Sequence, residues 1–442
     1  MRIVLINSNR YRRQPIIPFG LCAVAATLEQ AGHEVHGLDL CFSENCVLDI
    51  TDKVESVNPD VIGISVRNID SCTGHNLHFF LQEIKNDVID PCKQAFSGPI
   101  VIGGPSVGIN GPEMLTFFDL HYAIQGDGEA AMLEFIRRVE RHLPFSNIEG
   151  LVIREHDHII ENNSPWRVAD LDALPFINPS RYFDLQPYLD KKAKLQIQTK
   201  RGCALKCSYC TYNDIEGRSY RYRSPQRVAD EIEYLVKETG IKTIEFTDST
   251  FNVPLDHAKA VLRAIAAKNI ALKLYTLGMH PKSIDQELIA LMKAVNFEWV
   301  ALGIEAGNNA MLKSLGKNFT TKDIHNAGKL LHDANIRLCW SLLIGAPGET
   351  EDTIRETFET MDRIVVPQDE VMISIGIRVY KGTPIAKMLL SEKEVCSTDN
   401  FFQPYLFLPD TLSLEKMYTL TEQITRGKDN YVILGEPSCT KK

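Results

Sequence analysis

Three cysteines stand close together near the middle of the chain, at Cys203, Cys207 and Cys210. Three thiolates at this spacing can hold three irons of a cubane cluster, whereas a closed electron-carrier cluster needs four cysteines. One iron is then left open to another ligand. The spacing therefore predicts a 4Fe-4S cluster that does chemistry at its fourth iron.

Two other uses of these cysteines fit the sequence less well. A structural zinc site needs a fourth Cys or His close by, but the next downstream candidates are His257 and Cys339. A disulfide framework is disfavoured because eleven cysteines in 442 residues are an odd and sparse set. The cluster remains the better interpretation.

The cysteine segment, with the aromatic Tyr209 just before its third cysteine, resembles the radical S-adenosylmethionine (SAM) superfamily. The resemblance implies that SAM chelates the open iron and is cleaved to a 5′-deoxyadenosyl radical, which abstracts a hydrogen from the substrate. In that family Tyr209 would line the adenine of SAM. The match extends over residues 195–390.

The sequence around this loop predicts alternating strands and helices that would position it. A helix is expected over 225–239, with Ser224 as N-cap and Gly240 as terminator. Six strand-helix units suit the partial (β/α)6 barrel of radical SAM enzymes. The expected strands cover residues 195–199, 242–247, 271–276, 298–304, 336–343 and 371–377.

In barrels of parallel strands the functional polar residues lie at the carboxyl ends of the strands. Asp248 follows the second strand and is the candidate acceptor for the amino group of SAM, with Ser249 and Thr250 as alternates. Asp248 could instead cap the turn before a helix expected at 255–268.

Three further strand ends resemble SAM-binding segments. Glu305 is the candidate for the ribose hydroxyls, and the backbone around Gly345 for the adenine. Arg378 is the candidate partner of the SAM carboxylate, because a planar guanidinium suits that geometry. Glu305 could instead brace its own loop, and Arg378 could form an internal ion pair.

The first 150 residues predict a second, separate unit. Apolar runs at 3–6, 35–38, 61–66, 100–102 and 122–124 alternate with helical segments, which favours a doubly wound parallel sheet. Ligands of such sheets bind outside the carboxyl ends of the strands. The candidate binding residues there are Ser8, Asn9, Arg67, Asn68, Gly103, Gly104 and Gly126.

This unit resembles the Rossmann-like cobalamin-binding domain that precedes many radical SAM barrels. The resemblance rests on Pro18-Phe19-Gly20-Leu21, Gly32-His33-Glu34-Val35 and Gly103-Gly104-Pro105, in that order. No Asp-x-His-x-x-Gly motif supplies a histidine to cobalt. Arg67 could lie against the lower face of the corrin, or pair with Asp70 or a neighbouring loop acid, and the whole unit could be a remnant without cobalamin.

The expected domains are a Rossmann-like unit at 1–150, a linker segment at 151–190 packed over the sheet, a radical SAM barrel at 191–390 and a short C-terminal region at 391–442. The last region is too short for a substrate lid. We therefore expect a small substrate held between the units, or a partner protein or second subunit, as in a homodimer, that covers the site.

Charge and composition limit the expected partners and the expected compartment of the protein. A net charge of -9 disfavours a nucleic-acid partner, and the apolar run near Met1 is too short for a signal peptide or a membrane span. We expect a cytoplasmic protein, since a reducing compartment suits free cysteines and an iron-sulfur cluster. An external electron donor such as flavodoxin or ferredoxin would reduce the cluster.

The two resemblances together imply a cobalamin-dependent C-methyltransferase that acts on an unactivated carbon of a small-molecule or natural-product substrate. The main alternative is a radical SAM reaction without methyl transfer, such as diol dehydration, epimerisation, cyclisation or rearrangement. A non-enzymatic iron-sulfur or cobalamin carrier or sensor fits least, because a carrier would not need polar residues at several strand ends.

Overall fold

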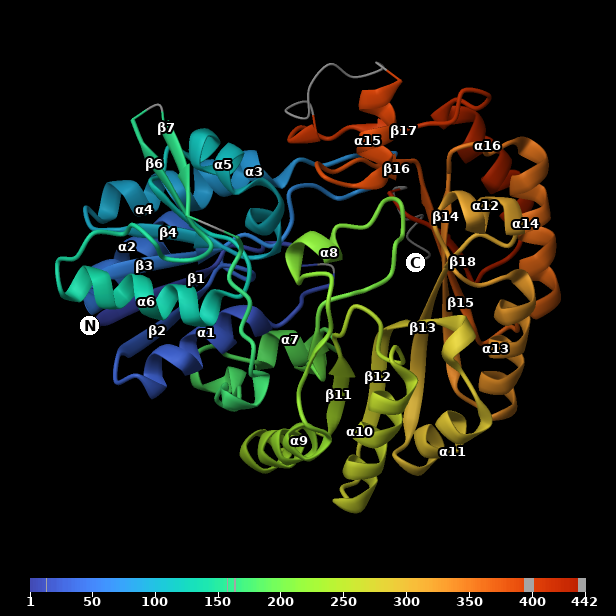
Figure 1. Cartoon of the computed structure of the whole chain (residues 1–442), viewed down its shortest axis with the longest axis horizontal. Helices are drawn as coiled ribbons and strands as arrows, with labels where there is room; N and C mark the ends of the chain where they lie inside the picture. Colours follow the sequence, from blue (N-terminus) through green and yellow to red (C-terminus); the bar gives the residue numbers. More distant parts are fainter. Residues whose placement is uncertain (13, 157, 163, 393–400, 436–442) are drawn as a thin grey trace.

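The computed structural model describes residues 1–12, 14–156, 158–162, 164–392 and 401–435. Its two main sheets lie side by side, the N-terminal sheet in blue and teal and the second sheet from green to red (Figure 1). No helix in these ranges is both long and apolar enough to cross a bilayer.

The N-terminal sheet has seven strands in the order β2-β1-β3-β4-β5-β6-β7. The first five are parallel, as the apolar runs predicted, and this order is that of a doubly wound sheet. The strands are β1 (Arg2–Asn7), β2 (Glu34–Asp39), β3 (Val61–Ser65), β4 (Ile100–Gly103), β5 (Tyr122–Ile124), β6 (Leu151–Glu155) and β7 (His158–Glu161).

Helices cover both faces of this sheet. One face packs against α1 and α6, and the other against α2, α4 and α5. The helices are α1 (Phe19–Gln30), α2 (Cys46–Val57), α3 (Phe80–Ile84), the π-helical turn η1 (Lys85–Ile89), α4 (Asp90–Ala95), α5 (Pro105–Phe118) and α6 (Gly128–Glu140).

The hairpin at the start of the expected linker belongs to the sheet. β6 pairs antiparallel with β5, and β7 pairs antiparallel with β6. The expectation that residues from 151 onward pack over the sheet is therefore wrong for this hairpin, because its backbone groups continue the ladder. Short helices follow it at η2 (Leu171–Ala173), η3 (Pro179–Arg181) and α7 (Gln186–Asp190).

The second sheet contains the six predicted barrel strands and one more, in the order β8-β11-β12-β13-β14-β15-β18, all parallel. The additional strand β18 comes from the C-terminal region and is too short to stand out as an apolar run. The strands are β8 (Leu195–Ile197), β11 (Thr243–Phe246), β12 (Lys273–Met279), β13 (Phe297–Glu305), β14 (Arg337–Ile344), β15 (Glu370–Ile375) and β18 (Tyr431–Ile433).

The predicted helix caps are present. Ser224 accepts a hydrogen bond from the Arg227 amide at the start of α9 (Pro225–Thr239), and Gly240 ends that helix with a φ of 71°. The remaining helices of the barrel are α10 (Leu255–Ala267), the 3-10 turn η4 (Pro281–Ser283), α11 (Gln286–Ala294), α12 (Asn309–Ser314), α13 (Thr321–Asp333), α14 (Glu351–Ile364), α15 (Pro384–Ser391) and α16 (Leu414–Thr425).

Short strands complete the structure near the cysteine loop and the chain's end. β9 (Lys200–Arg201) pairs with β10 (Arg221–Tyr222), and β16 (Ile377–Arg378) pairs with β17 (Leu406–Phe407). The four-residue helix α8 (Tyr212–Ile215) lies between the two large sheets (Figure 1) and packs against α5.

A loop of the N-terminal unit reaches the barrel and meets the C-terminal region there. The amide of His75 donates to the Tyr418 hydroxyl at 2.9 Å, and the Asn76 side chain donates to the Gly435 carbonyl at 2.7 Å. The chain itself therefore covers this side of the barrel. Residues 393–400 and 436–442 of the C-terminal region lie outside the described residues.

Candidate functional site

The three cysteines lie on an irregular loop between β9 and α8. Backbone hydrogen bonds fix this loop: the Cys203 amide donates to the Gly217 carbonyl, and the Ser208 amide donates to the Leu315 carbonyl, both at 2.9 Å. Gly202 adopts a φ of +92°, and a Cβ there would lie 2.1 Å from the Ser219 carbonyl oxygen. The loop conformation is thus set by contacts from sequence-distant backbone.

All three thiols are free, with Cys203 buried and the other two partly exposed. Burial raises the pKa of Cys207 while the nearby Lys317 ammonium opposes that rise. In the described ranges no three side chains converge on a single-ion site.

A smaller cavity of about 310 Å³ lies beside the loop, at the carboxyl ends of β13, β14 and β15. Cys210 and Tyr209 form its loop side. The other lining residues are Cys72, Thr211, Tyr212, Glu305, Ser341, Leu342, Leu343, Ser374, Gly376, Ile377, Arg378 and Tyr380. We call this space the smaller cavity below.

Tyr209 and Glu305, both predicted to contact SAM, are brought together on this cavity. The Tyr209 hydroxyl donates to Glu305 Oε1 at 2.8 Å. Glu305 sits at a bulge of β13 with a φ of +61°, which turns its side chain toward the cysteine loop. Their contacts with SAM stay predictions.

Lys317 completes this group and was missed from the sequence. Its Nζ lies 2.5 Å from Glu305 Oε2 and 3.1 Å from the Tyr209 hydroxyl, with its side chain 8% exposed. Burial would lower the pKa of Lys317, but Glu305 and Cys207 raise it overall, so the ammonium stays charged. No local pattern in the sequence marks a lysine in the loop after a short helix.

Arg378 forms the internal ion pair that the sequence left open. Its Nε donates to Asp70 Oδ2 at 2.7 Å, its Nη2 donates to the Phe401 carbonyl at 3.0 Å, and its Nη1 donates to the Val379 carbonyl. The Arg378 side chain is 3% exposed. Although it borders the smaller cavity, its donors are committed to the protein, which does not favour the predicted pairing with the SAM carboxylate.

Asp248 is also committed to the protein. Its carboxylate accepts from the Thr199 amide at 2.8 Å, the Thr199 hydroxyl at 2.7 Å and the Lys200 amide at 3.1 Å, with Lys200 Nζ at 3.4 Å. It thereby braces the strand that leads into the cysteine loop. The expected alternative, a cap on the turn before the helix at 255–268, is wrong, because among the described residues the carboxylate accepts from Thr199 and Lys200 and not from that turn.

The alternates to Asp248 have backbone partners as well. The Ser249 hydroxyl donates to the Gly202 carbonyl at 3.2 Å, and the Thr250 hydroxyl donates to the Ser249 carbonyl at 2.7 Å. Asp248 and Ser249 border the larger cavity described below rather than the smaller one. The predicted contact of these three residues with SAM remains untested.

Gly345 follows β14 with a φ of +107°, and its turn is held by Glu349. The buried Glu349 Oε2 accepts from the amides of Gly345 at 3.1 Å and Ala346 at 3.3 Å. Thr350 is the N-cap of α14. Glu349 thus shapes the turn that was predicted to face adenine, a role that remains a prediction.

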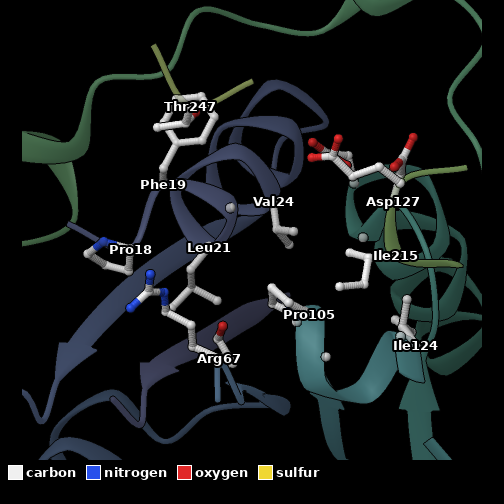
Figure 2. A pocket seen from close by; sticks show the side chains of 18 of the residues that line it. Pro18, Phe19, Leu21, Val24, Arg67, Pro105, Ile124, Asp127, Ile215 and Thr247 are labelled. Carbon is white, nitrogen blue, oxygen red and sulfur yellow. The ribbon is translucent and has the colours of Figure 1, made fainter. Parts of the chain in front are cut away.

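A larger cavity of about 490 Å³ lies between the N-terminal sheet and the barrel. Figure 2 shows Leu21, Arg67, Pro105 and Asp127 around it, together with Thr247 from the barrel side. Of the seven predicted cobalamin residues, Asn9, Arg67, Gly103, Gly104 and Gly126 line this cavity. Ser8 does not line it, since its hydroxyl donates to the Ser65 carbonyl, and neither does Asn68.

Arg67 is free to serve a ligand in this cavity. The expected alternative, pairing with Asp70, is wrong because Asp70 is taken by Arg378. Across the described part of the chain, the Arg67 guanidinium has no hydrogen-bond or ion-pair partner. Burial lowers the pKa of Arg67, so its charge is carried at a desolvation cost.

The cavity has the features that a large ligand requires. A Cβ at Gly104, whose φ is +103°, would lie 2.7 Å from the Val66 carbonyl oxygen, and a Cβ at Gly63 would lie 2.7 Å from Leu5. Asn9 Nδ2 is buried without a hydrogen-bond partner. The Cβ positions at Gly104 and Gly63 are thus filled by the protein itself, whereas the orphaned amide donor of Asn9 and the unpaired Arg67 fit a corrinoid with amide side chains.

Asp127, the N-cap of α6, and Glu129, in the first turn of that helix, form ion pairs that the sequence did not indicate. Glu129 Oε1 lies 2.5 Å from Arg201 Nη2, and Asp127 pairs with both Arg201 and Arg221. Burial would raise the pKa of Asp127, but the two arginines lower it overall. Because Arg201 lies two residues before Cys203, these pairs tie the rim of the larger cavity to the cysteine loop.

Comparison with known proteins identifies the two units. Residues 197–361 match the radical SAM superfamily, and residues 9–136 match the B12-binding domain. Tryptophan 2-C-methyltransferase of Streptomyces laurentii is 24% identical, covering 88% of this chain and 74% of its own length. The anaerobic magnesium-protoporphyrin IX monomethyl ester cyclase of Synechocystis sp. is 25% identical, covering 90% and 79%.

A solved structure has the same architecture. It is the radical SAM methyltransferase TsrM from Kitasatospora setae with cobalamin and a [4Fe-4S] cluster bound, at a TM-score of 0.80 and 24% identity. The match covers 88% of this chain and 75% of that one. At this identity the likeness establishes the fold.

Proposed function

We propose that this chain, a radical SAM superfamily protein with a B12-binding domain ahead of its barrel, is a cobalamin-dependent C-methyltransferase. It would act on an unactivated carbon. One observation carries the proposal. A cavity with an unpaired arginine and a cavity beside the cysteine loop share Tyr212 of α8 as a lining residue. Two cofactor-sized spaces thus adjoin at one short helix.

The residues around each space fit a defined part of the cofactor set. Cys203, Cys207 and Cys210 would hold the cluster, while Tyr209 and Glu305 would hold SAM. Arg67, Asn9, Gly103, Gly104 and Gly126 would hold cobalamin. When bound, these groups supply one-electron cleavage of SAM and transfer of a methyl group.

Lys317 is better placed than Arg378 for the SAM carboxylate. Its ammonium adjoins Glu305 and Tyr209 at the cysteine loop, whereas each end of the Arg378 guanidinium already donates within the protein. Lys317 and Glu305 would exchange part of their mutual ion pair for the carboxylate and ribose hydroxyls of SAM. In that exchange Lys317 would keep an anionic partner, and Glu305 would accept hydrogen bonds from the hydroxyls.

A second candidate is a reaction without methyl transfer. The cyclase of Synechocystis sp. matches this chain over as large a share as the tryptophan methyltransferase does, and at similar identity. The two activities are separated by their SAM products. Methyl transfer gives S-adenosylhomocysteine, while a purely radical reaction gives 5′-deoxyadenosine without it.

The test is anaerobic reconstitution with iron, sulfide and hydroxocobalamin, followed by incubation with methyl-deuterated SAM, a reductant and a panel of small molecules. Tryptophan, the substrate seen with TsrM, is a suitable first member. We expect a bound corrinoid, S-adenosylhomocysteine and a deuteromethylated product. A protein that binds no corrinoid and forms no S-adenosylhomocysteine would contradict the proposal.

We also propose flavodoxin or ferredoxin as the electron donor and a small molecule as the substrate. The donor is tested by replacing the chemical reductant with reduced flavodoxin or ferredoxin. Formation of 5′-deoxyadenosine with either protein supports it. Its absence with both, while the chemical reductant still works, contradicts it.

A further inference from the structure

The cysteine loop has a side that faces solvent. Ala204 and Lys206 are exposed there, and neither borders the larger or the smaller cavity. The cavity side of the loop is formed instead by Tyr209, Cys210 and the two residues that follow. The loop therefore presents one side to the cofactor cavities and another side to solvent.

The segment that ends α12 meets the loop at its solvent side. A Cβ at Gly316 would lie 2.4 Å from the Lys206 carbonyl oxygen, and the Ser208 amide donates to the Leu315 carbonyl at 2.9 Å. Lys313 is exposed in the last turn of α12, and its carbonyl accepts from the Gly316 amide at 3.1 Å. The backbone of Lys313 is thus held close to that of Lys206.

The start of α15 meets the loop as well. The Ile385 amide donates to the Ser208 carbonyl at 3.0 Å. Lys387 is exposed two residues farther along that helix. Three exposed lysines from separate parts of the chain are therefore gathered around one turn of the cysteine loop. We call Lys206, Lys313 and Lys387 the loop lysines below.

The charge of this surface is not balanced locally. Residues 200–213, 309–319 and 379–391 contain no Asp or Glu, although the whole chain has 57 acids against 48 Lys and Arg. The other four cations of these segments pair with acids from elsewhere, namely Lys200 with Asp248, Arg201 with Glu129, Lys317 with Glu305 and Lys381 with Glu113. Among the described residues, the loop lysines have no ion-pair or hydrogen-bond partner for their ammonium groups. A net-negative protein thus keeps three unpaired positive charges beside its cysteine loop.

We propose that the loop lysines are the docking surface for an acidic face of the one-electron carrier protein that reduces the cluster. The inference rests on the proposed electron donor and names the place where that donor binds. In this step the carrier loses one electron and the cluster gains it, so no bond forms or breaks. Lys206 directly precedes the partly exposed Cys207, so a carrier seated here lies next to a cluster ligand.

Unpaired surface charges suit a transient electron-transfer complex. Such a complex buries little area, and complementary charges speed the encounter of the two proteins without a large apolar contact. The net charge of this chain is -9, so most of its surface repels an acidic carrier and a local positive surface would orient the approach. Because the loop lysines border neither cavity, a docked carrier leaves both cavities open to their ligands.

The experiment measures how fast reduced flavodoxin of net negative charge reduces the reconstituted cluster, from the loss of cluster absorbance in anaerobic stopped flow. The test variant combines Lys206→Gln, Lys313→Gln and Lys387→Gln. We expect its second-order rate constant to be about tenfold below that of the wild type at an ionic strength of about 0.02 M. The two constants should agree within about twofold at about 0.5 M, because salt screens exposed charges. Photoreduced 5-deazariboflavin, a small reductant that needs no docking surface, should reduce both proteins at the same rate.

The matched control combines Lys237→Gln, Lys242→Gln and Lys293→Gln. These exposed lysines precede the amino ends of β11 and β13, at the end of the barrel strands opposite to the cysteine loop (Figure 1). The control and the test variant have the same net charge, so they differ only in where the charges are lost. The control should keep the wild-type rate within about twofold.

Cross-linking gives a second readout that does not depend on cluster reduction. A carbodiimide joins lysines to carboxylates that are in contact, and mass spectrometry should find flavodoxin attached at the loop lysines and not at the three control lysines. If the test variant fails to load a cluster, Lys313→Gln with Lys387→Gln takes its place, since it leaves the cysteine loop itself unchanged. That double variant should lower the rate at low salt by about threefold.

The outcomes separate this inference from the proposed donor. A wild type that the small reductant reduces, but that neither flavodoxin nor ferredoxin reduces, contradicts the proposed donor. Where only ferredoxin reduces the wild type, the same comparison is made with ferredoxin. With either carrier, a test variant that reacts as fast as the wild type at low salt overturns the docking surface. A control that slows as much as the test variant, or cross-links that all lie outside the loop lysines, would overturn it equally.

Discussion

Replacing Asp248 with asparagine should destabilise the barrel, because the carboxylate is the counter-ion of a buried lysine. The side chains of Asp248 and Lys200 are 0% and 1% exposed, and Lys200 Nζ lies 3.4 Å from Asp248 Oδ2. Asparagine retains an oxygen for the Thr199 and Lys200 amides but leaves the ammonium without a charge partner. A loss of stability would therefore distinguish a residue that braces the fold from a residue whose only role is to contact SAM.

The expected magnitude follows from the burial of both partners. Removing one partner of a buried ion pair costs about 3–5 kcal/mol, since the other charge stays out of water. With a slope of about 3 kcal/mol per molar urea, a loss of about 4 kcal/mol moves the unfolding midpoint by about 1.3 M.

Tryptophan fluorescence is a suitable readout, because Trp299 and Trp340 lie in the barrel strands β13 and β14. Ser249→Ala is the matched control and should cost about 1 kcal/mol, as it removes one hydrogen bond to the Gly202 carbonyl. The double variant Asp248→Asn with Lys200→Met should recover most of the lost stability, since it removes the unpaired charge as well.

The reasoning would be refuted by an Asp248→Asn variant whose unfolding midpoint stays within the range of Ser249→Ala. A large loss of SAM affinity in such a variant would instead favour the contact with the SAM amino group that the sequence predicted. A double variant no more stable than Asp248→Asn would show that the charge pair is not the source of the loss.

Burial raises the pKa of Glu216 from 4.5 to about 7, so the folded protein keeps a proton that the unfolded chain releases. The resulting stabilisation of the fold is fully present below about pH 4.5 and is lost as the pH rises through about 7. The loss in the free energy of unfolding is about 3 kcal/mol in all. Urea midpoints at several pH values should show this decline in the wild type and not in Glu216→Gln, and parallel pH profiles would contradict it. Glu129→Gln should lower the free energy of unfolding by about 3 kcal/mol and lower the cluster absorbance, because Arg201 loses its closest partner beside the cysteine loop. The control is Glu113→Gln, which removes the partner of a lysine that is 42% exposed. It should cost less than about 1 kcal/mol and leave the cluster intact. Arg67→Ala should leave the free energy of unfolding within about 0.5 kcal/mol of the wild type and weaken hydroxocobalamin binding in a spectral titration. Unchanged binding would contradict the placement of its guanidinium against the corrin.

The elements of this protein could be predicted because their signals are local. The strands of the N-terminal unit followed from short apolar runs, and the bounds of α9 followed from Ser224 and Gly240 at its ends. The cysteine spacing is local as well, since a loop of a few residues sets the distances among the three sulfurs. Each of these signals is complete within a few neighbouring residues.

The strand β18 and the place of the β6–β7 hairpin were not predicted. β18 is a three-residue strand whose pairing with β15 depends on a segment about 60 residues away. The hairpin was visible in the sequence, but its pairing with β5 was not. Which segment pairs with the edge strand of a sheet depends on which backbone N–H and C=O groups of that strand still lack partners in the folded sheet.

By itself, the sequence determined that this chain holds a three-cysteine loop at the head of a parallel barrel, with a doubly wound sheet before it. Only the tertiary structure decided which charged side chains remain for ligands. Asp70 lies 308 residues from Arg378, and Asp248 lies 49 from Thr199, yet these pairs form, and Arg67 is left without a partner among the residues that the structure describes. Partners at such separations are chosen by packing and by the cost of burying a charge alone, and neither quantity can be read from neighbouring residues.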